Sequence, residues 1–176
     1  MTPVRGSGNT KRNLWSVSIR RVLKSGTGRA PMEFFVVRRI NSDLRVGAEF
    51  RPEDRRLVPT WNYRLINATD TIPEVAIGQS TAWPSSKTDG SAYSLSIAQT
   101  FGDAWSAYLS ASYAPNGDLW QMPAGLNYRI SDQWSTRAMW DGSNLHPVLT
   151  HQHENMSYSF LLLGGTDPTL TVAFGF

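Results

Sequence analysis

The sequence is dominated by a two-residue alternation of apolar with small or polar side chains, which recurs along most of its length. In the stretch 44–51, Leu, Val, Ala and Phe alternate with Arg, Gly, Glu and Arg. The stretch 122–130 and the final seven residues, L-T-V-A-F-G-F, show the same period. Successive side chains of a β-strand point to opposite faces, so this period predicts strands with one apolar face. Helical periodicity is nearly absent, and we predict an all-β chain.

Turn residues divide the alternating runs into strands of about ten residues. We predict about 12 strands, within a range of about 10–12. Their expected positions are residues 13–24, 31–42, 43–52, 57–67, 72–82, 91–101, 104–115, 120–131, 133–142, 145–153, 155–164 and 169–176.

The connections between these strands are of two kinds. Tight turns recur near Asp43, Asp70, Asp103 and Asp132. Between them fall connections that are often longer and rich in Pro or Gly, at 52–55, 83–90, 115–118, 141–144 and 164–168. Because alternate connections of an up-and-down sheet lie at opposite ends, we expect one end with short turns and one with longer loops.

A sheet of this size cannot leave its apolar face and edges exposed to water, so it must form a sandwich or close into a barrel. Charged residues are only 18% of the chain, and the non-apolar faces hold mostly Ser, Thr, Gly and Ala. These features favour an antiparallel up-and-down transmembrane β-barrel with its apolar face outward. The expected domain is 13–176, either a whole barrel or the C-terminal part of a larger one, after a flexible basic segment at 1–12. The alternative is a soluble all-β binding module, a sandwich or a lipocalin-like barrel.

The alternation also predicts which side chains line the lumen and which form aromatic girdles at the membrane interfaces. The lumen candidates are Arg45, Glu49, Arg64, Asn127, Arg129 and Arg137. The girdle candidates, expected at strand ends, are Trp15, Trp61, Trp83, Trp105, Trp120, Trp134 and Trp140.

The ending L-T-V-A-F-G-F resembles the C-terminal β-signal of bacterial outer-membrane β-barrels, a terminal Phe preceded by apolar or aromatic residues at alternate positions. The resemblance implies that Leu170, Val172, Phe174 and Phe176 are recognised by the barrel-assembly machinery. It also implies a location in the bacterial outer membrane, with lipid around the barrel. The end of the chain and the short turns would then lie on the periplasmic side.

Three shorter strings, P-E-V-A-I-G at 73–78, P-A-G-L-N-Y at 123–128 and W-D-G-S-N at 140–144, are similar to barrel segments of YjbH-like proteins. Those proteins are linked to exopolysaccharide secretion, so this resemblance implies a structural role in envelope polysaccharide export. The strand pattern itself predicts a narrow barrel with porin-like passage of small polar solutes.

Other chemistry finds little support in the sequence. The chain has no cysteine, and its one metal-like group is His146, His151 and His153 with Glu154, which we interpret as polar residues of the periplasmic rim. The triplet His151-Gln152-His153 lacks the His and Ser two residues apart of outer-membrane phospholipases. We therefore predict no metal, no cofactor and no catalysis.

Positive charge is concentrated in the first third of the chain. Residues 1–60 hold 13 Lys and Arg against 5 Asp and Glu, and residues 61–176 hold 4 against 9. We interpret the excess as arginines of the lumen or rim and predict no nucleic-acid partner. The first twelve residues lack the apolar region of a secretory signal, which weighs against export, and no stretch is long and apolar enough for a spanning helix.

Overall fold

The computed structural model describes residues 13–24, 30–82 and 90–176, which form thirteen strands and one short 3-10 helix. The expected segment 1–12 lies outside these residues. The strands are β1 (Trp15–Val22), β2 (Met32–Arg39), β3 (Leu44–Arg51), β4 (Arg56–Ile66), β5 (Glu74–Thr81), β6 (Ser91–Phe101), β7 (Trp105–Ala114), β8 (Leu119–Gln121), β9 (Ala124–Arg129), β10 (Trp134–Trp140), β11 (Leu145–His153), β12 (Met156–Leu163) and β13 (Asp167–Gly175). The helix, η2, spans Pro115–Gly117.

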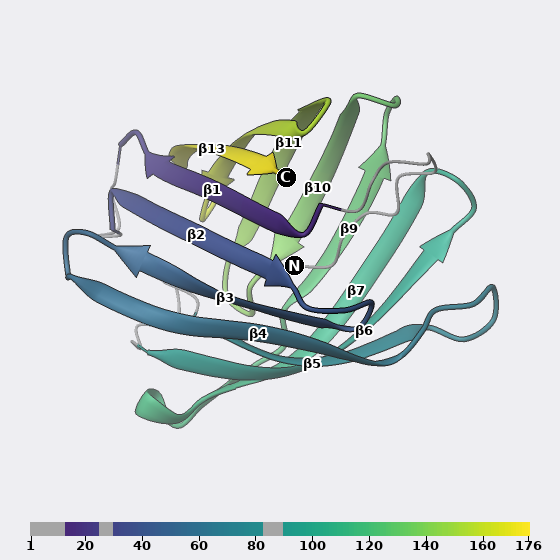
Figure 1. Cartoon of the computed structure of the whole chain (residues 1–176), viewed down its shortest axis with the longest axis horizontal. Coiled ribbons are helices and arrows are strands. Elements are labelled where there is room, and N and C mark those ends of the chain that lie inside the picture. Colours follow the sequence, from purple (N-terminus) through teal and green to yellow (C-terminus); the bar gives the residue numbers. More distant parts are fainter. Residues whose placement is uncertain (1–12, 25–29, 83–89) are drawn as a thin grey trace.

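The sheet is a closed antiparallel barrel (Figure 1). Consecutive strands pair with each other, and β1 pairs with β13 to close the ring. Both β8 and β9 pair with β7, so they are two parts of one strand and the barrel has twelve strands. The break falls at Met122 and Pro123, where proline has no N–H to donate. The predicted all-β antiparallel barrel of about twelve strands is confirmed.

The connections are divided between the two ends of the barrel as the turn pattern predicts. The expected difference in length is not found among the described connections, because those at 52–55, 115–118, 141–144 and 164–166 have three or four residues and 67–73, at the other end, has seven. We call the end with the turns at 40–43, 67–73, 102–104, 130–133 and 154–155 the turn end, and the opposite end the loop end. The final strand finishes at the turn end, where the Trp15 N–H donates to the Phe176 carbonyl over 2.8 Å. Antiparallel order therefore places the connections at 52–55, 115–118, 141–144 and 164–166 together at the loop end.

The tight turns are held by side chains that accept hydrogen bonds from the backbone. The Asn41 side-chain oxygen accepts from the N–H groups of Asp43 and Leu44, each over 2.8 Å. The Ser131 hydroxyl accepts from the Trp134 N–H over 3.1 Å, and Thr69 plays the same part at 67–73. Short polar side chains stabilise turns in this way. At these three turns the closing residue is thus not the aspartate that marks the turn in the sequence.

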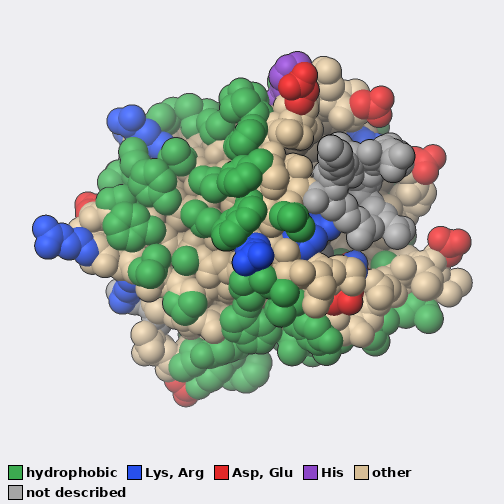
Figure 2. Space-filling model, viewed as in Figure 1, with side chains coloured by type: hydrophobic (Ala, Val, Ile, Leu, Met, Phe, Trp, Pro, Cys, Tyr) green, Lys and Arg blue, Asp and Glu red, His purple; other side chains and the backbone are tan. Residues whose placement is uncertain are grey.

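The apolar faces of the strands point outward. Leu95, Leu126 and Leu170 are 50%, 46% and 45% exposed, and the space-filling view shows apolar side chains covering much of the face over β1–β4 (Figure 2). The inner faces carry small and polar residues with two small apolar clusters at the loop end. One joins Val22, Leu161 and Leu163, and the other joins Ala82, Ala92 and Ala114. Within the described residues, no helix is both long and apolar enough to cross a membrane.

Candidate functional site in the barrel interior

The charged side chains of the strands are segregated to the inside of the barrel. Among the described strand residues, only Arg21 and Arg38 point outward, and each lies near a strand end. The register and burial of the strands place the other charged residues on the inner face. They are Arg20, Glu33, Arg39, Arg45, Glu49, Arg51, Arg56, Arg64, Glu74, Arg129, Arg137 and Asp167.

All six lumen candidates lie on this inner face. Arg45 and Glu49 are at inward-facing positions of β3, and Arg64 is at an inward-facing position of β4. Asn127 and Arg129 of β9 face the interior beside Arg137 of β10, because Asn127 and Arg137 are directly paired across the two strands. Whether these residues line an open passage stays a prediction.

An ion-pair network fills the interior near the loop end on the side of β1–β3. The Glu33 carboxylate contacts the guanidinium groups of both Arg20 and Arg51, the latter at 3.2 Å. The Arg51 Nε also lies 2.9 Å from Glu49, and the Thr81 hydroxyl donates to Glu49. Glu33 and Glu49 are 3% and 4% exposed. Two buried carboxylates thus neutralise two guanidinium groups, as buried charges require.

A second buried network lies at the loop end on the side of β10–β13. The His146 Nε2 lies 2.7 Å from the Asp141 Oδ2, and both side chains are fully buried. The Gly164 N–H donates to the His146 Nδ1 over 2.8 Å. Because Nδ1 accepts this bond, the Nε2 carries the hydrogen that is donated to Asp141. The network ties the 141–144 connection to the 164–166 connection.

The expectation that the histidines lie together at one rim is wrong for His146. His146 points into the barrel at the loop end, whereas His151 and His153 point outward near the turn end. The His151 ring stacks on Trp134, with ring centroids 4.6 Å apart. β11 has nine residues, so His146 near its start and His153 at its end lie at opposite ends of the barrel. No group of three or more His, Asp or Glu in the described part of the chain could hold a metal ion.

At the turn end, Arg64 joins β4 to the turn before β3 and to β5. Its guanidinium lies 2.8 Å from the Asp43 carboxylate, donates to the Ser42 carbonyl over 2.8 Å and reaches Glu74 at 3.4 Å. The hydrogen bond from Arg64, with a second from the Ser42 hydroxyl, lowers the pKa of Asp43 below its ordinary value. Arg64 is therefore paired with two carboxylates, Asp43 and Glu74.

Three inner arginines make no ion pair with a carboxylate among the described residues: Arg45, Arg129 and Arg137. Arg137 donates to the side-chain oxygen of Asn127, and Arg129 donates to the Asp103 carbonyl. Arg45 lies beside Arg39 on the paired strand, with no hydrogen bond of its own in the described structure. The inner faces of the described strands carry eight arginines against four carboxylates, so the interior has an excess of positive charge.

No protein-family model matches this chain, and no curated protein is significantly similar to it.

The aromatic residues of the outer face lie at both ends of the barrel. Trp15, Trp105 and Trp134 are at the turn end, and Trp120 and Trp140 are at the loop end. Neighbouring rings are in contact, as in the pair Trp105 and Tyr128, whose centroids are 4.5 Å apart. Trp61 is a correction to the strand-end expectation, because β4 continues for five residues on each side of it. Trp83 lies outside the described residues.

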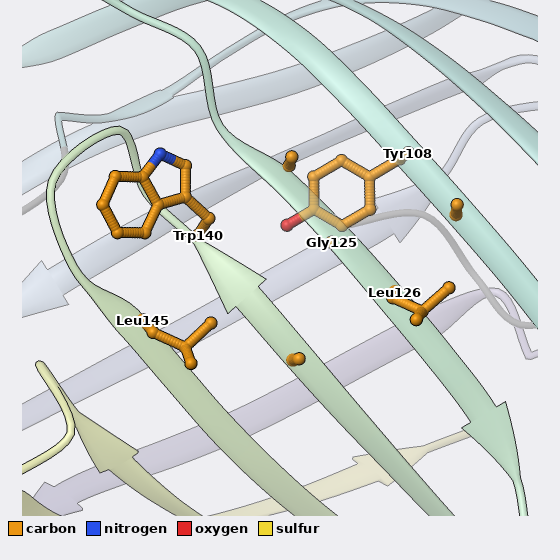
Figure 3. Close-up of a pocket in the computed structure, with 8 residues that line it drawn as sticks. Tyr108, Gly125, Leu126, Trp140 and Leu145 are labelled. Atoms are coloured by element: carbon orange, nitrogen blue, oxygen red, sulfur yellow. The ribbon is translucent and has the colours of Figure 1, made fainter.

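The outer wall also has a shallow hollow of about 350 Å³ over β7, β9, β10 and β11. Trp140, Leu145 and Leu126 surround it, and alanines of the neighbouring strands form its floor (Figure 3). Tyr108 lies against Gly125 on the paired strand, so that a Cβ on Gly125 would come within 2.3 Å of the tyrosine ring. The hollow is apolar and contains no candidate for chemistry.

Proposed function

We propose that this protein is a β-barrel of the bacterial outer membrane whose narrow, arginine-lined interior passes small polar solutes. One observation carries the proposal: the described strands keep their outer faces almost free of charge and collect their charged side chains inside. A barrel in lipid needs this distribution, because an arginine on the lipid-facing side costs about 2–4 kcal/mol near the midplane.

The exposed apolar surface supports a lipid surrounding. Apolar residues on the outer face repeat along every long strand, and Leu57 and Trp120 are 67% and 69% exposed. Soluble monomers rarely expose contiguous apolar patches larger than a few hundred Å². The soluble alternative expects apolar faces turned inward, and the orientation of these residues does not favour it. The longest strands, β4 and β6, have 11 residues each, which is the length that spans a bilayer when tilted.

The C-terminal motif supports the outer-membrane assignment. The side chains of Leu170, Val172, Phe174 and Phe176 all point outward, and those of Phe174 and Phe176 stack with centroids 5.7 Å apart. This apolar row is accessible from outside the barrel, as recognition by the barrel-assembly machinery requires. The residues that resemble the β-signal thus form one outward-facing row.

The interior supports passage of small polar solutes rather than bulky ones. A barrel of twelve strands is narrow, and ion pairs and inward residues such as Phe35 and Tyr108 occupy part of its cross-section. The role in polysaccharide export implied by the YjbH-like strings stays a prediction, since no contact in the described residues bears on it.

The experiment is purification of the full chain and reconstitution. We expect the protein to need detergent, to migrate differently on a gel before and after boiling, and to produce small current steps in planar bilayers. A chain that is monodisperse in buffer without detergent would overturn the membrane assignment. A detergent-folded barrel that admits neither ions nor small sugars into liposomes would overturn the passage of solutes alone.

A further inference from the structure

The inner arginines fall into two electrostatic groups along the barrel axis. Near the loop end, Arg20 and Arg51 share the buried carboxylates Glu33 and Glu49. Near the turn end, Arg64 forms ion pairs with Asp43 and Glu74. Neither Arg45 nor Arg137 forms an ion pair with a carboxylate of the described residues.

Arg45 and Arg137 lie on opposite walls. Arg45 belongs to β3 and Arg137 to β10, and the closed strand order separates these strands by six steps in either direction. Both side chains point inward, Arg45 from the turn end of β3, where it is the second residue, and Arg137 from the middle of β10. A solute that moves along the interior therefore meets one guanidinium group near the turn end and another halfway along the barrel.

The neighbours of each guanidinium do not neutralise it. Arg45 faces Arg39 directly on the paired strand, a like-charged arrangement that is unfavourable across a sheet. Glu74, whose charge acts on Arg45, is itself paired with Arg64 at 3.4 Å. Around Arg137, the polar partners are the neutral side chains of Asn127 and Met139, with Tyr108 nearby on β7.

A buried charge without a partner is costly, and a counter-ion relieves that cost. Guanidinium groups bind oxyanions and halides through charge-assisted hydrogen bonds. We propose that the barrel interior binds small inorganic anions, with Arg45 near the turn end and Arg137 halfway along the barrel as the side chains that contact them. This inference rests on the proposed function, since it assigns that passage a preference for anions.

The first test measures chloride binding by the folded barrel in detergent, from the broadening of the chloride-35 NMR line. The wild-type chain is compared with R45Q/R137Q and with R21Q/R38Q, which removes the same charge from the outer face. Loss of charge-assisted hydrogen bonds weakens binding by about tenfold. We therefore expect broadening by the wild type and R21Q/R38Q and its near loss in R45Q/R137Q. Equal broadening by all three, or none by the folded wild type, overturns the inference.

A competition experiment on the wild-type chain tests the proposed anion binding even if R45Q/R137Q does not fold. Inorganic phosphate should displace chloride and narrow the line, whereas a large organic sulfonate at equal ionic strength should not. No difference between the two competitors overturns the site.

A second test measures the reversal potential of bilayer currents under a potassium chloride gradient, with anion preference expected for the wild type. Cation preference overturns the inference. Because detergent requirement and heat-modifiable migration are measured on the same preparation, a folded membrane barrel without anion binding refutes this inference and leaves the proposed location intact.

Discussion

The imidazole of His146 and the carboxylate of Asp141 form a fully buried hydrogen bond of 2.7 Å, five residues apart across the connection between β10 and β11. Asp141 also accepts from the N–H groups of Ser143 and Asn144, each over 2.8 Å, so one carboxylate shapes the whole connection. Through Gly164, the imidazole extends this order to the connection between β12 and β13.

We predict that His146→Ala destabilises the barrel. The change leaves the buried Asp141 oxygen and the Gly164 N–H without this partner, which costs about 1–3 kcal/mol for each group left unpaired. Urea unfolding of the detergent-folded protein, followed by tryptophan fluorescence, measures the change. His153→Ala is the matched control, because His153 lies exposed on the outer face. Equal stability of the two variants would contradict the structural role of His146.

The contact between Tyr108 and Gly125 predicts a second effect on stability. Gly125→Ala forces its new Cβ against the tyrosine ring, and overpacking of this kind costs about 1–3 kcal/mol. The double variant Tyr108→Ala with Gly125→Ala removes the clash. A double-mutant cycle in urea should therefore show strong coupling, whereas additive effects would mean that the ring moves away freely.

Much of the fold is predictable from the sequence, because a two-residue period is a local property that each strand displays on its own. The two-residue period of β3 places Arg45 and Glu49 on one face and predicts that both point inward. The same period places Arg51, two residues after Glu49, on that face. The interruption at Pro123 had a signal as well, since proline cannot donate to a strand ladder.

The contacts between distant segments could not be predicted in the same way. Glu33 meets Arg20 and Arg51 only because the register of three strands brings these side chains to one level. The meeting of His146 with Gly164 depends on the closure of two hairpins side by side. Residue spacing alone grouped His146 with His151 and could not show that one points inward and the other outward.

The hydrogen bond between Arg64 and Asp43 makes stability depend on pH. The pKa of Asp43 is lower in the folded barrel than its ordinary value of 3.8. As the pH falls, Asp43 is therefore protonated in the unfolded chain before it is protonated in the folded barrel. Its contribution to the free energy of unfolding is complete above pH of about 4 and is lost as the pH falls further.

We predict that Asp43→Asn lowers the free energy of unfolding at pH 7 and that its difference from the wild type shrinks to zero in acid. Urea titrations in detergent from pH 7 to about pH 2 measure both curves. Asp132→Asn is the control, since Asp132 lies in a turn at the same end without an arginine partner among the described residues. A difference that is constant with pH would assign the effect of Asp43 to something other than its charge.

The resemblance of the C-terminal motif to the β-signal predicts a specific effect on assembly. Phe176→Ala should reduce the amount of barrel in the outer membrane of cells several-fold, with little change in refolding of the purified chain into detergent. Phe101→Ala is the matched control, because Phe101 is 55% exposed and Phe176 56%, and both are at the turn end. Equal loss of membrane-assembled protein in the two variants would argue against recognition of Phe176.

The stability cost of an arginine introduced on the outer face depends on its depth in a bilayer but not in water, so it distinguishes a membrane barrel from a soluble one. Leu95 lies near the middle of β6, and Leu57 is the second residue of β4 at the loop end. Both are well exposed, at 50% and 67%, so in water Leu95→Arg and Leu57→Arg should have similar small effects. In a bilayer, Leu95→Arg should cost about 2–4 kcal/mol and Leu57→Arg about 0–1 kcal/mol. Reversible folding into liposomes, followed by heat-modifiable migration, measures the difference, and equal costs would refute the membrane-spanning arrangement.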